Sequence, residues 1–150
     1  MSIEVAVRYA TRRPWAPAPV SLRCWAEAAA SSARAHGELA IRVVGSAEGR
    51  RLNRGYRRKD KATNVLSFVP GPVPARIEKP LGDLVICAPV VAREAKEQGK
   101  ALRAHWAHMV VHGVLHLAGH DHEQDVEAQA MESLERRILD RLGFPDPYEA

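Results

Sequence analysis

Residues 101–122, ALRAHWAHMVVHGVLHLAGHDH, decide the fold that we expect for this chain of 150 residues. At 100° per residue, segment 101–118 carries apolar or alanine side chains around most of its circumference, so we predict a helix that is buried on nearly every side. One stripe differs, because it carries histidines at intervals of three, four and four residues: His105, His108, His112 and His116. Such a helix has to be covered by other elements, which predicts a central position in the fold.

The end of this segment has a spacing that is typical of metal sites. His112 and His116 stand four residues apart on one helix face, Gly119 lets the chain turn, and His122 supplies a third imidazole. Three neutral imidazoles leave the fourth position of a tetrahedral zinc ion open to water, which is the arrangement of a catalytic zinc site. We therefore predict one Zn²⁺ per chain at His112, His116 and His122. Imidazole ligands also suit Ni²⁺.

Other residues near the predicted zinc site bear on its ligands and on its chemistry. His105 and His108, each taken alone, are interpreted as ordinary core or surface histidines, and His120 could compete with the third ligand for the metal. Metalloproteases with this spacing carry a glutamate directly after the first histidine as general base, whereas this chain has Gly113 there. The missing glutamate argues against peptidase chemistry. Asp121 is expected to orient a ligand or to cap the following helix.

The flanking sequence predicts a small sheet with helices packed on it. Residues 3–9 alternate apolar and polar side chains, as a half-buried strand does. Short apolar and β-branched runs predict three more strands, at 39–45, 63–69 and 81–88. Helical patterns cover 21–37, 46–58, about 89–98, 101–118 and 124–142. Because strands dominate the first half and helices the second, we expect an α+β fold with a small mixed β-sheet packed against several helices.

Individual residues indicate where two of these helices begin or end, and one stretch indicates a loop. Ser21 is expected to cap the first helix, which Gly37 would stop, and Ser46 can cap the second helix. The stretch 70–80 is rich in proline, so we expect a long surface loop between two strands.

Composition sets the cellular context. The length, with 46% hydrophobic and 27% charged residues, predicts one domain over residues 1–150. Cys24 and Cys87 form no CxxC motif and are interpreted as small buried hydrophobes, and the N-terminal residues show no apolar targeting segment. We therefore expect a cytoplasmic protein with no membrane span. A net charge of +4 and a pI near 9.4 favour anionic partners such as nucleic acid.

Positive charge is concentrated between residues 50 and 61. The basic side chains are Arg50, Arg51, Arg54, Arg57, Arg58, Lys59 and Lys61. Tyr56 lies among them and offers a surface on which a base could stack. One interpretation is a solvated helix face followed by a turn; the other is a segment that contacts RNA phosphates.

Three stretches together resemble the YbeY-type endoribonucleases, the bacterial rRNA maturation factors. HGVLHLAGHDH (112–122) is similar to their HGxLHLxGYDH signature. YRRKDKATNVLSF (56–68) resembles YRxKDxPTxVLSF, and LGDLVIC (81–87) resembles LGDIxI. The three stretches follow the family's order and, with the segments between them, span about half of the chain. The differences are His120 in place of tyrosine, Ala62 in place of proline, and a less acidic loop before residue 81.

The resemblance implies a single-strand-specific, zinc-dependent endoribonuclease that acts in ribosomal RNA processing, at the 3′ end of 16S rRNA, and in ribosome quality control. Its partners would be single-stranded RNA, ribosomal RNA and the small ribosomal subunit. The resemblance also places Arg57 in the catalytic cleft, where a guanidinium could clamp a phosphate. Asn64, Ser67 and Asp83 fall on the family's strands, and structural roles are expected for them.

Two other classes of function remain open. One is a metal-dependent hydrolase that acts on a different substrate class, against which Gly113 argues. The other is a non-catalytic ribosome-assembly factor whose zinc is structural. A fourth protein ligand such as His120 would support that class, whereas an open coordination position would count against it.

Overall fold

The structure, a computed structural model, describes residues 3–11, 16–57, 63–120 and 124–149, and only the backbone of residues 56 and 57. The strands within these residues are β1 (Ile3–Tyr9), β2 (Gly37–Val44), β3 (Val65–Phe68) and β4 (Gly82–Cys87). The helices are α1 (Pro19–Ser32), α2 (Ser46–Arg57), α3 (Ala88–Gln98), α4 (Leu102–Leu117) and α5 (Asp125–Arg141).

The strands form one mixed sheet in the order β1-β2-β4-β3. β1, β2 and β4 are parallel to one another, and β3 pairs antiparallel with β4. Successive side chains of β4 point to opposite faces, so Leu84 and Ile86 join a larger core while Val85 and Cys87 join a smaller one. The small mixed sheet expected from the strand patterns is confirmed.

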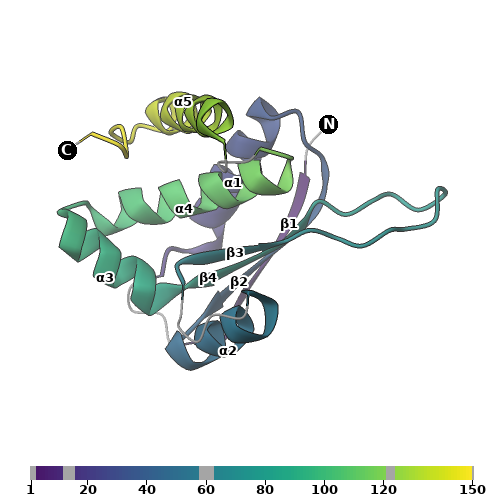
Figure 1. The fold of residues 1–150 in the computed structure, drawn as a ribbon, viewed down its shortest axis with the longest axis horizontal. Coiled ribbons are helices and arrows are strands. Elements are labelled where there is room, and N and C mark those ends of the chain that lie inside the picture. Colours follow the sequence, from purple (N-terminus) through teal and green to yellow (C-terminus); the bar gives the residue numbers. More distant parts are fainter. Residues whose placement is uncertain (1–2, 12–15, 58–62, 121–123, 150) are drawn as a thin grey trace.

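Helices cover both faces of this sheet, as Figure 1 shows, with α4 and α5 on one side and α2 on the other. The larger core lies between the sheet and helices α1, α4 and α5. α4 is at its centre: most of its residues between His105 and Leu115 are buried, and Trp106 has no exposed surface. The expected central buried helix is therefore confirmed.

The expected ends of the first helix are wrong. α1 begins at Pro19 with Ala18 at the N-cap position, so Ser21 lies inside the helix. Proline is favoured there because its fixed φ suits the first turn and the missing N–H would have no partner in any case. The helix ends at Ser32, and Gly37 instead begins β2 with a φ of 114°, where a Cβ would lie 2.8 Å from the Lys79 carbonyl oxygen.

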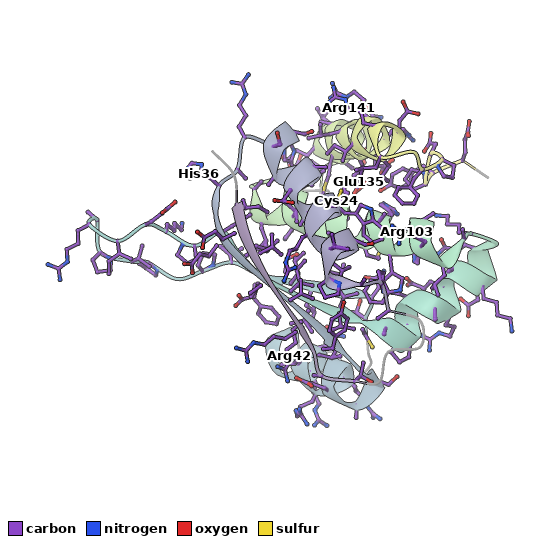
Figure 2. The ribbon with its side chains drawn as sticks, turned by 180° about the vertical axis from the view of Figure 1, so that it is seen from behind. Cys24, His36, Arg42, Arg103, Glu135 and Arg141 are labelled. Atoms are coloured by element: carbon purple, nitrogen blue, oxygen red, sulfur yellow. The ribbon has the colours of Figure 1, made fainter. Side chains whose placement is uncertain are left out.

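The two cysteines differ in their surroundings. Cys87 is buried in the smaller core, and burial raises the pKa of its thiol. Cys24 is exposed, which contradicts the expectation that both are buried. The inward face of α1 is formed by Leu22, Trp25 and Ala26, so Cys24 falls on the opposite side of this helix (Figure 2).

The proline-rich stretch connects β3 to β4 as the long surface loop that we expected. Figure 1 shows it projecting well beyond the body of the molecule. Val69 and Ile77 on this loop are more than half exposed. No described helix is both long and apolar enough to cross a membrane.

Candidate metal centre

The four histidines of α4 become more accessible toward the C-terminal end of the helix. His105 and His108 are buried, whereas 26% of the His112 side chain is exposed and His116 is also partly exposed. α4 ends at Leu117, and Gly119 turns the chain with a φ of 103°. A metal could therefore be reached by solvent at His112 and His116. The third predicted ligand, His122, lies outside the described residues, as does Asp121.

Glu135, on α5, is the main residue of this site that the sequence patterns did not single out. Its side chain has no exposed surface and lies on the side of α5 that faces the rest of the molecule (Figure 2). One carboxylate oxygen, Oε2, is 2.6 Å from Nδ1 of His112. The other, Oε1, accepts a hydrogen bond from the Tyr148 hydroxyl and lies 3.4 Å from Nε2 of His108. A charged residue at helical spacing from the buried Met131 and Ile138 was the available signal.

The charge of Glu135 determines which nitrogen of a neutral His112 carries the proton and which carries the lone pair. Burial alone would raise the pKa of Glu135, but hydrogen bonds from His108 and His112 and their charge lower it to about 2. An ionised carboxylate only accepts hydrogen bonds, so the proton of the short bond lies on Nδ1 of His112. A neutral His112, the form that can bind a metal, then has its lone pair on Nε2, the nitrogen on the far side of the ring.

His108, His112 and Glu135 form a cluster of three groups that could hold a metal ion, with ligand atoms within 4.8 Å of one another. The distance between Nδ1 of His112 and Oε2 of Glu135 distinguishes two uses of this cluster. Two atoms that bind one tetrahedral zinc ion at about 2.0 Å stand about 3.3 Å apart. The observed 2.6 Å is a hydrogen-bond distance, so these two atoms contact each other directly.

His105 belongs to a separate polar contact that joins three elements. Its Nε2 lies 2.9 Å from Oε1 of Glu94 on α3, and Glu94 also accepts a hydrogen bond from the side-chain amide of Asn64. Burial lowers the pKa of His105, against the opposing effect of Glu94. Asn64 also accepts a hydrogen bond from the backbone N–H of Val65 at the start of β3. These contacts agree with a structural role for Asn64 and with a supporting role for His105.

Gly113, at the position of the missing glutamate, faces the sheet. A Cβ at this position would lie 2.7 Å from Cδ2 of Leu84 and 3.4 Å from Cγ2 of Val65. The Ser67 hydroxyl donates a hydrogen bond to the Gly113 carbonyl oxygen at 3.3 Å, which ties α4 to β3. A side chain at position 113 would therefore point into the larger core rather than toward a metal beside His112. The packing of α4 thus gives a physical reason for the glycine.

The basic segment lies apart from the histidines where the structure describes it. α2 packs on the sheet face opposite to α4 (Figure 1), with Arg50, Arg51 and Arg54 exposed. Arg57 is the last residue of α2, and its side chain lies outside the described residues. Residues 58–62, which include Arg58, Lys59 and Lys61, lie outside them too. The sheet therefore separates the described part of the segment from His112.

Comparisons with known proteins agree on one family. The sequence profile described as "Endoribonuclease YbeY" matches residues 20–143. A protein named endoribonuclease YbeY from Stenotrophomonas maltophilia is 61% identical over 97% of this chain and 93% of its own length. One of the same name from Nitrosococcus oceani is 55% identical over 100% of this chain and 99% of its own length.

A solved structure shows that the fold is shared more widely. The solution structure of a Thermotoga maritima protein matches with a TM-score of 0.62 at 20% sequence identity, over 97% of this chain and 99% of that one. Identity at this level supports the fold alone, whereas the full-length matches above 50% identity identify the family. The chain belongs to the endoribonuclease YbeY family.

Proposed function

We propose that this endoribonuclease cleaves single-stranded RNA with the help of one Zn²⁺ ion held by His112, His116 and His122. The observation that carries the proposal is the state of His112. Its Nδ1 contacts the buried Glu135 carboxylate, and we propose Nε2 as the ligand atom at the accessible end of α4. Imidazole nitrogens in this spacing suit zinc, and they also suit nickel.

We propose a separate chemical role for each of the residues around the site. Zinc at a site of three imidazoles supplies an activated water near neutral pH. Glu135 holds a proton on Nδ1 of His112 and so keeps that ring in one tautomer. Gly113 contributes no side chain and therefore no general base. We propose that Arg57 clamps the scissile phosphate with its planar guanidinium and stabilises the charge that develops on it.

The RNA surface would extend from the histidines to α2. The net charge of +4 and the exposed Arg50, Arg51 and Arg54 favour a polyanionic ligand. We propose that Arg58, Lys59 and Lys61, which follow Arg57 in the sequence, also contact RNA. Because the sheet lies between α2 and α4, an RNA that touches both has to bend around its edge. Flexible single-stranded RNA can follow such a path, whereas a stiff duplex cannot.

The proposed cellular role follows from the family. We place this chain in ribosomal RNA processing, at the 3′ end of 16S rRNA, and in ribosome quality control, with the small ribosomal subunit as partner and the cytoplasm as location. A specific observation keeps a second candidate open: a structural metal could occupy the cluster of His108, His112 and Glu135. That arrangement would suit a non-catalytic assembly factor.

Metal analysis of two histidine variants tests the proposal. We expect the purified protein to carry about one equivalent of a divalent transition metal and to cleave single-stranded RNA faster than a duplex of the same sequence. His116→Ala should lose both metal and cleavage, because it removes one of three ligands. His36→Ala, which removes an exposed histidine elsewhere, should retain both. Full metal occupancy in His116→Ala would contradict the proposed ligand set and favour the buried cluster.

A further inference from the structure

The buried carboxylate of Glu135 and the segment after α5, residues 144–149, form one connected structure behind His112. We infer that Glu135 and Tyr148 are positioning residues for metal binding: Glu135 orients His112, and Tyr148 orients Glu135. The inference rests on the proposed ligand set, because it takes Nε2 of His112 as a metal ligand. It goes beyond that set by assigning a part in metal affinity to residues that do not touch the ion.

Glu135 has the contacts that such a part requires. A carboxylate with no exposed surface is costly to keep ionised unless hydrogen-bond donors surround it. Here His112 donates from Nδ1 to Oε2 at 2.6 Å, and the Tyr148 hydroxyl donates to Oε1. Burial and the nearby carboxylate raise the pKa of Tyr148, so its hydroxyl keeps the proton that it donates. Both oxygens are thus held by a side chain from another part of the chain.

His112 gains a defined orientation from this bond. Histidines that bind metals usually donate their second ring N–H to a carboxylate, a backbone carbonyl or water. Such a bond selects the tautomer, fixes the plane of the ring and makes the ligand nitrogen more basic. His112 is partly exposed at the accessible end of α4. The ring can therefore present Nε2 outward while Nδ1 faces the buried carboxylate.

Residues 144–149, the C-terminal tail, are held against the body of the protein at several points. Phe144 packs edge-on against Trp25 of α1, with ring centroids 5.7 Å apart. Asp146 accepts a hydrogen bond from Nε of Arg136 at 3.1 Å, and the Pro147 carbonyl oxygen accepts one from Lys100 at 2.6 Å.

The same tail also places the Tyr148 ring. The Arg136 guanidinium stands 5.1 Å from the centroid of this ring, within the range of a cation–π contact. The His108 ring lies 5.3 Å from it, on the side of α4. The tail therefore delivers the Tyr148 hydroxyl to Glu135 from a fixed direction.

Zinc affinity, measured by competition with a chromophoric chelator, tests the inference. We expect Glu135→Gln to weaken zinc binding by about tenfold to a hundredfold. A neutral amide orients His112 less well, and it makes Nε2 of this ring a less basic ligand atom than a carboxylate does. Tyr148→Phe should weaken binding in the same direction but less. Glu97→Gln, on the exposed face of α3, and Tyr9→Phe, which removes a hydroxyl elsewhere, should match the wild type. Thermal melting of the metal-free proteins identifies variants that are merely unfolded.

A spectroscopic measurement on the unmodified protein keeps the inference falsifiable even if Glu135→Gln does not fold. Long-range ¹H–¹⁵N correlation spectra of the zinc-loaded chain report which nitrogen of each histidine carries the proton. We expect His112 to be bound through Nε2 and protonated on Nδ1. Binding through Nδ1 would overturn the inference, because Glu135 and His112 would then share the ion directly. Affinities within twofold of wild type in both folded variants would also overturn it.

His116→Ala separates this inference from the proposed function. If His116→Ala binds zinc as the wild type does, the proposed ligand set fails. If it loses zinc while Glu135→Gln and Tyr148→Phe bind normally, the ligand set stands and only the positioning role of Glu135 and Tyr148 is wrong.

Discussion

The four imidazoles of α4 differ in the side chains that surround them, although they share one stripe of the helix. His105 contacts Glu94, and His108 and His112 both contact Glu135. Only His112 and His116 are at the accessible end of α4. At the scale of single residues, burial therefore distinguishes His105 and His108, which are covered, from His112 and His116, which solvent can reach.

Arg57 offers a test that separates its geometry from its charge. Lysine keeps the charge but cannot reproduce the planar guanidinium, so Arg57→Lys should lower kcat by about tenfold to a thousandfold if Arg57 stabilises the transition state. Metal content should be unchanged, and RNA affinity should fall only slightly. Single-turnover cleavage of single-stranded RNA measures this effect. Arg141→Lys, an equally conservative change on the exposed side of α5 in Figure 2, is the control.

Equal and small effects in Arg57→Lys and Arg141→Lys would contradict a catalytic role for Arg57. Arg57 would then contribute only to the positive potential that attracts RNA.

At the scale of elements, the contact between α4 and the sheet depends on a missing side chain. Gly113→Ala places a Cβ 2.7 Å from Cδ2 of the fully buried Leu84. Overpacking a core costs about 1–3 kcal/mol, whereas alanine gains about 1 kcal/mol over glycine inside a helix. We therefore expect Gly113→Ala to lower the free energy of unfolding by up to about 2 kcal/mol, as measured by urea denaturation.

Gly55→Ala is the matched control for this prediction. Gly55 also lies inside a helix, α2, but a Cβ there would meet no atom within 4 Å. This variant should raise the free energy of unfolding by about 0.5–1 kcal/mol through helix propensity alone. A gain in stability in both variants would show that Leu84 moves aside and that α4 tolerates a side chain at position 113.

At the scale of the whole molecule, the two faces of the sheet carry different side chains. One face holds α4 with its histidines, and the other holds α2 with its exposed arginines (Figure 1). That residues 1–150 form a single domain stays a prediction. Its net charge of +4 attracts RNA from all sides, but only a local contact releases counterions from specific phosphates.

Salt dependence measures that local contact. The affinity for single-stranded RNA should fall as salt rises, with a slope in the logarithmic plot of about −0.7 for each phosphate contacted. Replacing Arg50, Arg51 and Arg54 together by alanine should make this slope less steep by about two units, as followed by fluorescence anisotropy. The control removes the same charge from exposed positions on α3 and α5, by replacing Arg93, Arg137 and Arg141 with alanine. Equal slopes in the two triple variants would contradict an RNA contact at α2.

The sequence by itself determined the features that depend on spacing along one element. The period of α4, the i, i+4 pair His112 and His116, and the turn at Gly119 follow from residues that are close in the chain. The helical pattern of residues 21–37 predicted the wrong ends for α1, because Pro19 begins the helix and Gly37 begins β2, where a Cβ would meet the Lys79 carbonyl oxygen. The alternation of residues 3–9, the short apolar runs and the order of strands and helices also predicted the small mixed sheet.

Only the tertiary structure decided which distant residues meet. Glu135 reaches His112, and Tyr148 reaches Glu135, because α5 and the tail pack beside α4, and no local period in the sequence encodes these contacts. The same holds for the side of the sheet that α2 covers. Periodicity tells which face of an element is apolar, but the partner of that face is chosen by the packing of the whole chain.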